Sequence, residues 1–129
     1  MTTPLIAVTG ATGKIGGAVA EHLRDAGLAP RLLVRDASRA PRWADDVAVA
    51  ESGSDILLMV SAAESENRLE QHRAFITSAA QALVKHVVYT SFVGAAPGAT
   101  FTLSRTHWYT EEALRESGMG YTFLRDSFY

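Results

Sequence analysis

Three glycines spaced three residues apart near the start of the chain could form a phosphate-binding turn. Gly10, Gly13 and Gly16 follow a short apolar run, Leu5 to Val8, and open a helical pattern of apolar residues. Gly10 would allow a tight turn out of the strand, and Gly13 would let backbone N–H groups approach an anion at the positive end of the helix. Gly16 would let the helix pack closely on the strand. This order of elements predicts a site for the pyrophosphate of a dinucleotide.

The spacing, G-x-x-G-x-x-G, differs from the G-x-G-x-x-G of many dehydrogenases. It is not the phosphate loop of nucleoside triphosphatases, because no Ser or Thr follows the Gly-Lys pair. A glycine turn that serves only packing is the alternative. The residues of the turn that are predicted to contact a cofactor are Gly10, Ala11, Thr12, Gly13, Lys14, Ile15 and Gly16.

Arginines after the second predicted strand bear on the choice of cofactor. A carboxylate here would accept hydrogen bonds from the ribose of NAD, whereas an arginine would pair with the 2′-phosphate of NADP. Arg35 comes first after the strand, with Arg39 and Arg42 close behind it. The pattern favours NADP, and Asp36 keeps NAD open as an alternative. Arginines that only solvate a surface turn would give the same pattern.

Apolar runs alternate with helical patterns along the chain, which is typical of a parallel sheet with crossover helices. The predicted strands are Leu5 to Val8, Arg31 to Val34, Val47 to Ala50, Asp55 to Val60, His86 to Ser91 and Tyr121 to Leu124. The predicted helices run from the glycine turn to about Ala26, from about Glu66 to Leu83 and from about Ser104 to Ser117. The sequence therefore predicts an α/β fold, a Rossmann-like doubly wound parallel sheet in three α/β/α layers.

Two small residues follow the fourth predicted strand. Ser61 and Ala62 would lie at the carboxyl end of the sheet, where a dinucleotide binds. We predict that both contact the cofactor, although an ordinary turn is an equal alternative. His72, on the helix that follows, is expected on the helix surface or at an interface rather than at a catalytic position.

The connection between the third and fourth predicted strands is unusually short. Only residues 51–54 separate Ala50 from Asp55. The usual connection crosses about 14 Å of sheet and also returns along the strand, and about five residue steps reach at most roughly 17 Å. Either the third run is not an edge strand of this sheet, or a helix is missing between Ala50 and Glu51. We favour the missing segment.

Composition limits the class of protein. The chain has 129 residues, enough for one domain, of which 47% are hydrophobic and 20% charged. Its net charge of -2 argues against a nucleic-acid partner. It has no cysteine, its 4 histidines lack metal-ligand spacing, and no serine lies in a G-x-S-x-G elbow. No apolar run suggests a targeting segment or a membrane span, so we expect a cytoplasmic protein without a membrane partner.

Several motifs together resemble one known family. They are Val-Thr-Gly-Ala-Thr-Gly-Lys-Ile-Gly at 8 to 16, Leu-Val-Arg-Asp at 33 to 36, Tyr-Thr-Ser at 89 to 91, Thr-His-Trp-Tyr-Thr-Glu-Glu at 106 to 112 and Tyr-Thr-Phe-Leu-Arg-Asp at 121 to 126. The chain resembles the NmrA-like branch of atypical short-chain dehydrogenases/reductases, and within it the quinone oxidoreductase type 2 and triphenylmethane-dye reductase groups. The resemblance implies a Rossmann domain that binds NADP(H).

The resemblance also implies parts that the chain lacks. Family members carry a further helix between the third and fourth strands, and they continue past the position of Tyr129 into a smaller substrate portion. We therefore expect residues 1–129 to be one NAD(P)-binding domain, truncated at its C-terminus and lacking a segment between Ala50 and Glu51.

The predicted chemistry is simpler than in ordinary short-chain dehydrogenases, which pair a tyrosine with a lysine four residues later. Lys14 and Lys85 are the only lysines, and neither has this spacing from a tyrosine. Ser91 stands where short-chain dehydrogenases place a serine that hydrogen-bonds a substrate carbonyl, and a purely structural role is an equal alternative. His107 could supply a proton, although a surface pair with Glu111 is the simpler interpretation. Ser91 and His107 are thus the candidate catalytic residues, and no metal site is expected.

Two functions fit these residues. The first is hydride transfer from NADP(H), with NAD as an alternative cofactor, to a small-molecule acceptor such as a quinone or another conjugated molecule. The second is a non-catalytic dinucleotide sensor that regulates a partner protein. A homodimer is compatible with either function.

Overall fold

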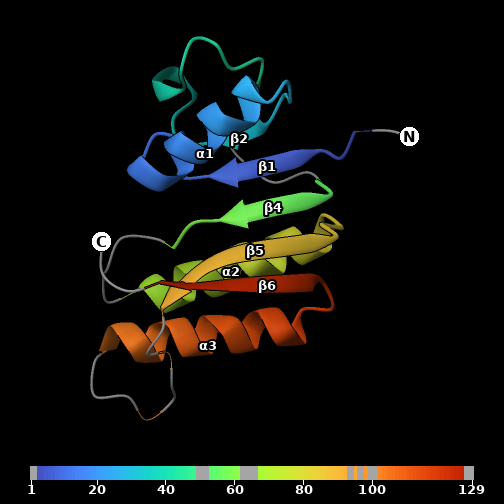
Figure 1. Cartoon of the computed structure of the whole chain (residues 1–129). Coiled ribbons are helices and arrows are strands. Elements are labelled where there is room, and N and C mark those ends of the chain that lie inside the picture. The colour runs from blue at the N-terminus through green and yellow to red at the C-terminus, as the bar shows by residue number, and fades with distance from the viewer. Residues whose placement is uncertain are drawn as a thin grey trace.

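The computed structural model describes residues 3–48, 53–61, 67–92, 95, 98 and 102–126. They form a six-stranded sheet in the order β3-β2-β1-β4-β5-β6, in which every neighbouring pair is parallel (Figure 1). The strands are β1 (Ile6–Thr9), β2 (Arg31–Leu33), β3 (Asp46–Ala48), β4 (Ile56–Met59), β5 (His86–Phe92) and β6 (Gly120–Asp126). The helices are α1 (Lys14–Asp25), a 3-10 turn η1 (Ala37–Arg39), α2 (Arg68–Gln81) and α3 (Thr102–Glu116). The predicted Rossmann-like α/β fold is confirmed.

Two apolar clusters hold the layers together. Consecutive strand residues such as Leu57 and Leu58 belong to opposite clusters, because neighbouring side chains of a strand point to opposite faces. One cluster includes Ala20 of α1, and the other includes Ile76 of α2 and Leu114 of α3. The central strands are therefore covered on both faces, which explains why β4 is a continuous apolar run.

The short connection before β4 is compatible with the usual strand order, contrary to the distance argument from the sequence. β3 pairs with β2 at the edge of the sheet, and β4 pairs with β1. The described part of β3 ends at Ala48 and β4 begins at Ile56, so eight residue steps with a reach of about 26 Å separate them. The described ends of β3 and β4 are thus farther apart along the chain than the ends of the predicted strands. Ala50 and Glu51 lie outside the described residues, so the missing segment between them stays a prediction.

Polar contacts tie the strands together at their amino ends. The Asp55 carboxylate accepts a hydrogen bond from the backbone N–H of Leu5 at 2.7 Å and lies 3.0 Å from the Lys85 ammonium. The bond from Leu5, followed by that from Lys85, lowers the pKa of the Asp55 carboxyl below its ordinary value. Contacts of the Asp55 and Lys85 side chains thus stabilise the sheet at the amino ends of its strands.

The turn between α2 and β5 contains a strained residue. Leu83 has a φ of 64° and is 80% exposed, so its side chain gains little burial to offset a left-handed backbone. We expect Leu83→Gly to raise the free energy of unfolding by about 0.5 to 1 kcal/mol, measured by urea denaturation. Leu83→Ala is the control, because it keeps the Cβ and should gain almost nothing. Destabilisation by Leu83→Gly would contradict this account.

Candidate cofactor site

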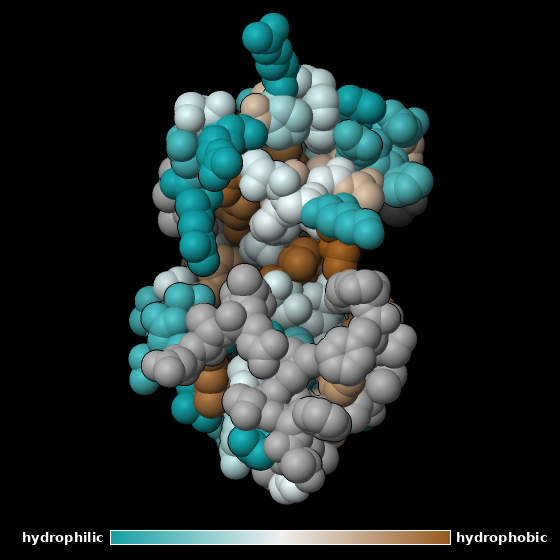
Figure 2. All heavy atoms as spheres, turned by 90° about the vertical axis from the view of Figure 1, so that its left-hand side faces the viewer, coloured by the Kyte–Doolittle hydropathy of each residue, from teal (hydrophilic) through white to brown (hydrophobic). Residues whose placement is uncertain are grey.

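A groove of about 700 Å³ lies at the carboxyl ends of β1, β2 and β4. Figure 2 faces this end of the molecule and shows a waist at mid-height with hydrophobic atoms exposed in it. The lining residues are Thr9, Gly10, Ala11, Thr12, Gly13, Lys14, Ile15, Gly16, Leu33, Val34, Arg35, Asp36, Arg39, Met59, Val60, Ser61, Gln71, His72 and Phe75. The structure thus brings together every predicted cofactor-contact residue that it describes, and Ala62 lies outside the described residues.

The glycine turn presses the first turn of α1 against the end of β1. Gly10 has a φ of 61°, and its carbonyl accepts a hydrogen bond from the Gly13 N–H at 2.8 Å. A Cβ on Gly16 would lie 2.2 Å from the Gly10 carbonyl oxygen, far inside contact distance. Only glycine fits this position without a shift of the backbone. The close approach aims the start of α1 into the groove.

The start of α1 can bind an anion. Its N-cap residue, Gly13, provides no side-chain hydrogen bond, and the first turn contains no acidic residue. The first N–H groups of a helix have no partner within the helix, and the helix dipole makes this end positive. The groove therefore offers backbone donors and a favourable field to a phosphate group.

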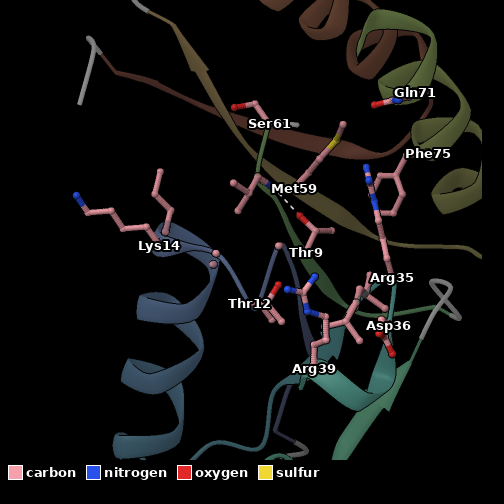
Figure 3. A pocket seen from close by; sticks show the side chains of 18 of the residues that line it. Thr9, Thr12, Lys14, Arg35, Asp36, Arg39, Met59, Ser61, Gln71 and Phe75 are labelled. Atoms are coloured by element: carbon pink, nitrogen blue, oxygen red, sulfur yellow. Dashed lines mark hydrogen bonds between the residues drawn. The ribbon is translucent and has the colours of Figure 1, made fainter. Parts of the chain in front are cut away.

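Side-chain hydroxyls hold the neighbouring strand ends in register. Thr9 Oγ1 accepts a hydrogen bond from the Val60 N–H at 2.8 Å, which joins β1 to the end of β4. Thr90 Oγ1 accepts one from the Ser61 N–H, also at 2.8 Å, which joins the end of β4 to β5. Ser61 is therefore held at the groove by its backbone, with its side chain among the lining residues (Figure 3).

The two arginines that favoured NADP both line the groove. In Figure 3, Arg39 points toward Thr12, whereas Arg35 reaches toward Phe75 of α2. Neither guanidinium forms an ion pair within the described part of the chain. Arg42 is exposed but is not among the lining residues. The groove thus has two available cations at the end of β2.

The Asp36 carboxylate is engaged locally. Its Oδ1 accepts hydrogen bonds from the Ser38 hydroxyl at 2.7 Å and from the Ser38 N–H at 3.0 Å. These bonds, the hydroxyl contributing most, lower the pKa of Asp36 and cap η1. One carboxylate oxygen is therefore already occupied, which reduces what Asp36 can offer to a ribose.

The two candidate catalytic residues lie outside the groove lining. Ser91 is buried, and its hydroxyl donates a hydrogen bond to the Glu111 carboxylate at 2.6 Å. His107 is buried as well, with Nδ1 2.6 Å from the Tyr89 hydroxyl. The surface pair expected for His107 and Glu111 is wrong, because α3 turns both side chains into the protein, where Glu111 is fully buried.

Glu111 joins α3 to the last two strands. Besides Ser91 of β5, it accepts hydrogen bonds from Arg125 of β6, at 2.9 Å from Nε, and it lies 3.4 Å from a guanidinium nitrogen of Arg115. Burial alone would raise the pKa of the Glu111 carboxyl. The hydrogen bonds from Arg125 and Ser91 and the charges of both arginines outweigh it, so the pKa lies below its ordinary value. Glu111 is therefore a buried carboxylate with its charge compensated.

Sequence reasoning missed the contribution of α2 to the groove, and of the two positions expected for His72 the helix surface is wrong, whereas the contact with Thr110 of α3 places it at a helix interface. His72 is only 3% exposed and lines the groove together with Gln71 and Phe75. Its Nδ1 lies 3.0 Å from the Thr110 hydroxyl, which donates its own hydrogen to the Thr106 carbonyl at 2.9 Å. The His72 Nδ1 must therefore carry the hydrogen of that contact.

The pKa of His72 is lowered to about 4, by burial first and then by the charges of Arg68 and His107. The ring is therefore neutral at pH 7. The sequence feature that indicates burial of His72 is its helical spacing from Ile76 and Ala79, which also lie on the buried side of α2.

Two kinds of feature are absent from the described residues. None of their helices is long and apolar enough to cross a membrane. No group of three or more His, Cys, Asp or Glu side chains among them could hold a metal ion.

Comparison with known proteins supports the interpretation of the groove. A family model described as NAD(P)H-binding matches residues 10–129. Quinone oxidoreductase 2 of Escherichia coli K12 is 34% identical over 141 aligned positions, which cover 97% of this chain and 49% of that protein. The NAD(P)H azoreductase of Xenophilus azovorans is 31% identical, with coverages of 97% and 48%. The chain thus spans about half the length of the curated relatives that it matches.

A solved structure with cofactor has the same fold. The triphenylmethane reductase of Citrobacter sp., crystallised in complex with NADP(H), superposes with a TM-score of 0.88 at 34% identity. The match covers 97% of this chain and 50% of that one. The resemblance inferred from the sequence motifs is confirmed by these matches.

Proposed function

The chain belongs to the NAD(P)H-binding family whose model it matches, and from this premise we propose that it is an NADP(H)-dependent oxidoreductase. Its acceptor would be a quinone or another conjugated small molecule. The relatives named as quinone oxidoreductase and azoreductase support this acceptor class. The observation that carries the proposal is the groove, which is lined by the start of α1 and by two arginines without ion pairs in the described structure.

The residues of the groove fit a dinucleotide phosphate. The N–H groups at the start of α1 would bind the pyrophosphate, and the closeness of Gly16 to β1 leaves that backbone accessible. Arg35 and Arg39 would bind the 2′-phosphate that distinguishes NADP from NAD. The bound dihydronicotinamide would supply the hydride.

The residues of this chain would contribute to the reaction mainly by positioning the cofactor and the acceptor. Lys85 is paired with Asp55 at the amino ends of the strands, and Lys14 lies at the start of α1, so neither stands in a tyrosine–lysine pair. A quinone accepts hydride without prior protonation, and its product can take a proton from solvent. Binding geometry and exclusion of water are therefore the contributions that we assign to the groove.

Arg35→Ala is expected to change the preference between cofactors. Loss of a charge-assisted contact to the 2′-phosphate should weaken NADPH binding about 10- to 100-fold, since such contacts contribute about 1.5 to 3 kcal/mol. NADH lacks this phosphate, so its dissociation constant should change less than about twofold. Calorimetric titration of both cofactors measures the two effects. Arg42→Ala removes an exposed arginine outside the groove and is the control. Equal losses for both cofactors would refute the assignment of Arg35.

Oxidation of NADPH in the presence of a panel of quinones tests the function itself. Turnover supports the oxidoreductase. Tight NADPH binding without turnover of any acceptor would favour the second function, a dinucleotide sensor, for which the absence of a tyrosine–lysine pair is the supporting observation.

A further inference from the structure

Arg68 is a buried cation with no ion-pair partner among the residues that the structure describes. It is 4% exposed, and its Nε has no hydrogen-bond partner. No ion pair in the described structure involves it. The buried carboxylate of Glu111 is bonded to Ser91 and Arg125 instead. A buried guanidinium nitrogen without a hydrogen-bond partner costs folding free energy, and an oxyanion bound to it would offset that cost.

The described groups on which the charge of Arg68 acts are imidazoles. Two buried imidazoles, His72 and His107, lie close enough for its charge to lower their pKa values, and both rings are neutral at pH 7. Glu70, the acidic residue in the first turn of α2, is exposed and forms no ion pair with Arg68 in the described structure.

Arg68 is also the first residue of α2. The N-cap residue, Asn67, makes no side-chain hydrogen bond to the helix end, so N–H groups of the first turn add donors and a positive dipole. Arg68 lies close enough to His72, a groove residue, for its charge to act on that ring. Gln71 and His72, one turn further along, line the groove.

We propose that Arg68 and the first turn of α2 form an anion site beside the groove, which binds a negatively charged oxygen of the acceptor. This inference rests on the proposed oxidoreductase function and narrows its substrate class to acceptors with an anionic group, such as an aromatic sulfonate or carboxylate. The favourable partner for an unpaired buried guanidinium is an oxyanion that reaches it together with helix N–H groups.

A pair of matched acceptors tests the site. We would measure kcat/KM for 1,4-naphthoquinone and its 2-sulfonate in the native protein, Arg68→Met, Arg68→Lys and Arg73→Met. The ratio of sulfonate to neutral acceptor should fall at least tenfold in Arg68→Met and less than threefold in Arg68→Lys. Arg73 is exposed on the same helix, so its variant should keep the native ratio. An unchanged ratio in Arg68→Met would overturn the proposal.

Two further measurements distinguish a loss of anion binding from a loss of protein stability and from a loss of NADPH oxidation. Arg68→Met should raise Tm by roughly 2 to 8 °C, because a buried unpaired charge is removed. A lower Tm with equal losses on both acceptors would instead mean a structural role and would overturn the site. Calorimetry with naphthalene-2-sulfonate should show at least tenfold weaker binding to Arg68→Met. That loss supports the site even if the native protein oxidises no NADPH, a result that would refute only the oxidoreductase function.

Discussion

Alanine in place of Gly16 is expected to weaken NADPH binding at least 100-fold, or to prevent folding. The added Cβ would lie 2.2 Å from the Gly10 carbonyl oxygen and 2.5 Å from that of Thr9. Both atoms belong to the backbone, so relief requires α1 to move away from β1 and takes its N–H groups out of position. Overpacking of this kind costs about 3 kcal/mol or more. Calorimetry with NADPH and urea denaturation of the same sample measure the two effects.

Gly17 is the matched control for this substitution. A Cβ on Gly17 would lie 3.2 Å from the Ala11 carbonyl oxygen, a tight contact that a small shift relieves. Alanine is also the better helix former by about 1 kcal/mol, so Gly17→Ala should keep both folding and NADPH binding near native levels. Native affinity in Gly16→Ala would show that close packing of α1 on β1 is not what forms the phosphate site.

Acidification from pH 6.5 to pH 4 is expected to remove several kcal/mol of stability. Burial, followed by the charge of Arg68, lowers the pKa values of His72 and His107 to about 4 in the folded protein. In the unfolded chain these rings protonate near pH 6.5. Between the two values the unfolded state binds more protons, so stability falls as the pH falls, by up to about 3 kcal/mol for each histidine.

Protonation of Glu111 is expected to remove further stability at still lower pH. Its folded pKa is depressed, so its contribution to stability is present above the ordinary carboxyl value and is lost as the pH falls through the folded value. Urea denaturation at pH 7.5, 6.0 and 5.0 measures the histidine part separately. The double variant His72→Asn, His107→Gln should show a much flatter dependence over this range. An equally steep dependence in that variant would contradict the assignment to these two histidines.

The glycine turn and the two arginines of the groove could be predicted from the sequence because their physical role is local. A positive φ at Gly10 and a close approach at Gly16 depend on residues only a few positions away. Arg35 and Arg39 follow directly from the end of β2.

The roles of His72, Ser91 and His107 could not be predicted, because long-range packing determines them. Arg68 lies on the buried face of α2 although a charged residue normally indicates an exposed position, whereas Leu69 beside it is less buried. The partner of Ser91 is Glu111, twenty residues away on another element. No periodicity in the sequence indicates that a serine hydroxyl will meet a carboxylate rather than a substrate.

The strained turn at Leu83 offers a practical attachment point. It lies beside β5 at the amino ends of the strands, where the Asp55–Lys85 pair holds the sheet, whereas the groove lies at the carboxyl ends. A fluorophore or a surface-immobilisation linker joined at this position would therefore leave the cofactor entrance unobstructed, so the molecule could be mounted on a sensor chip with its binding edge facing the solution.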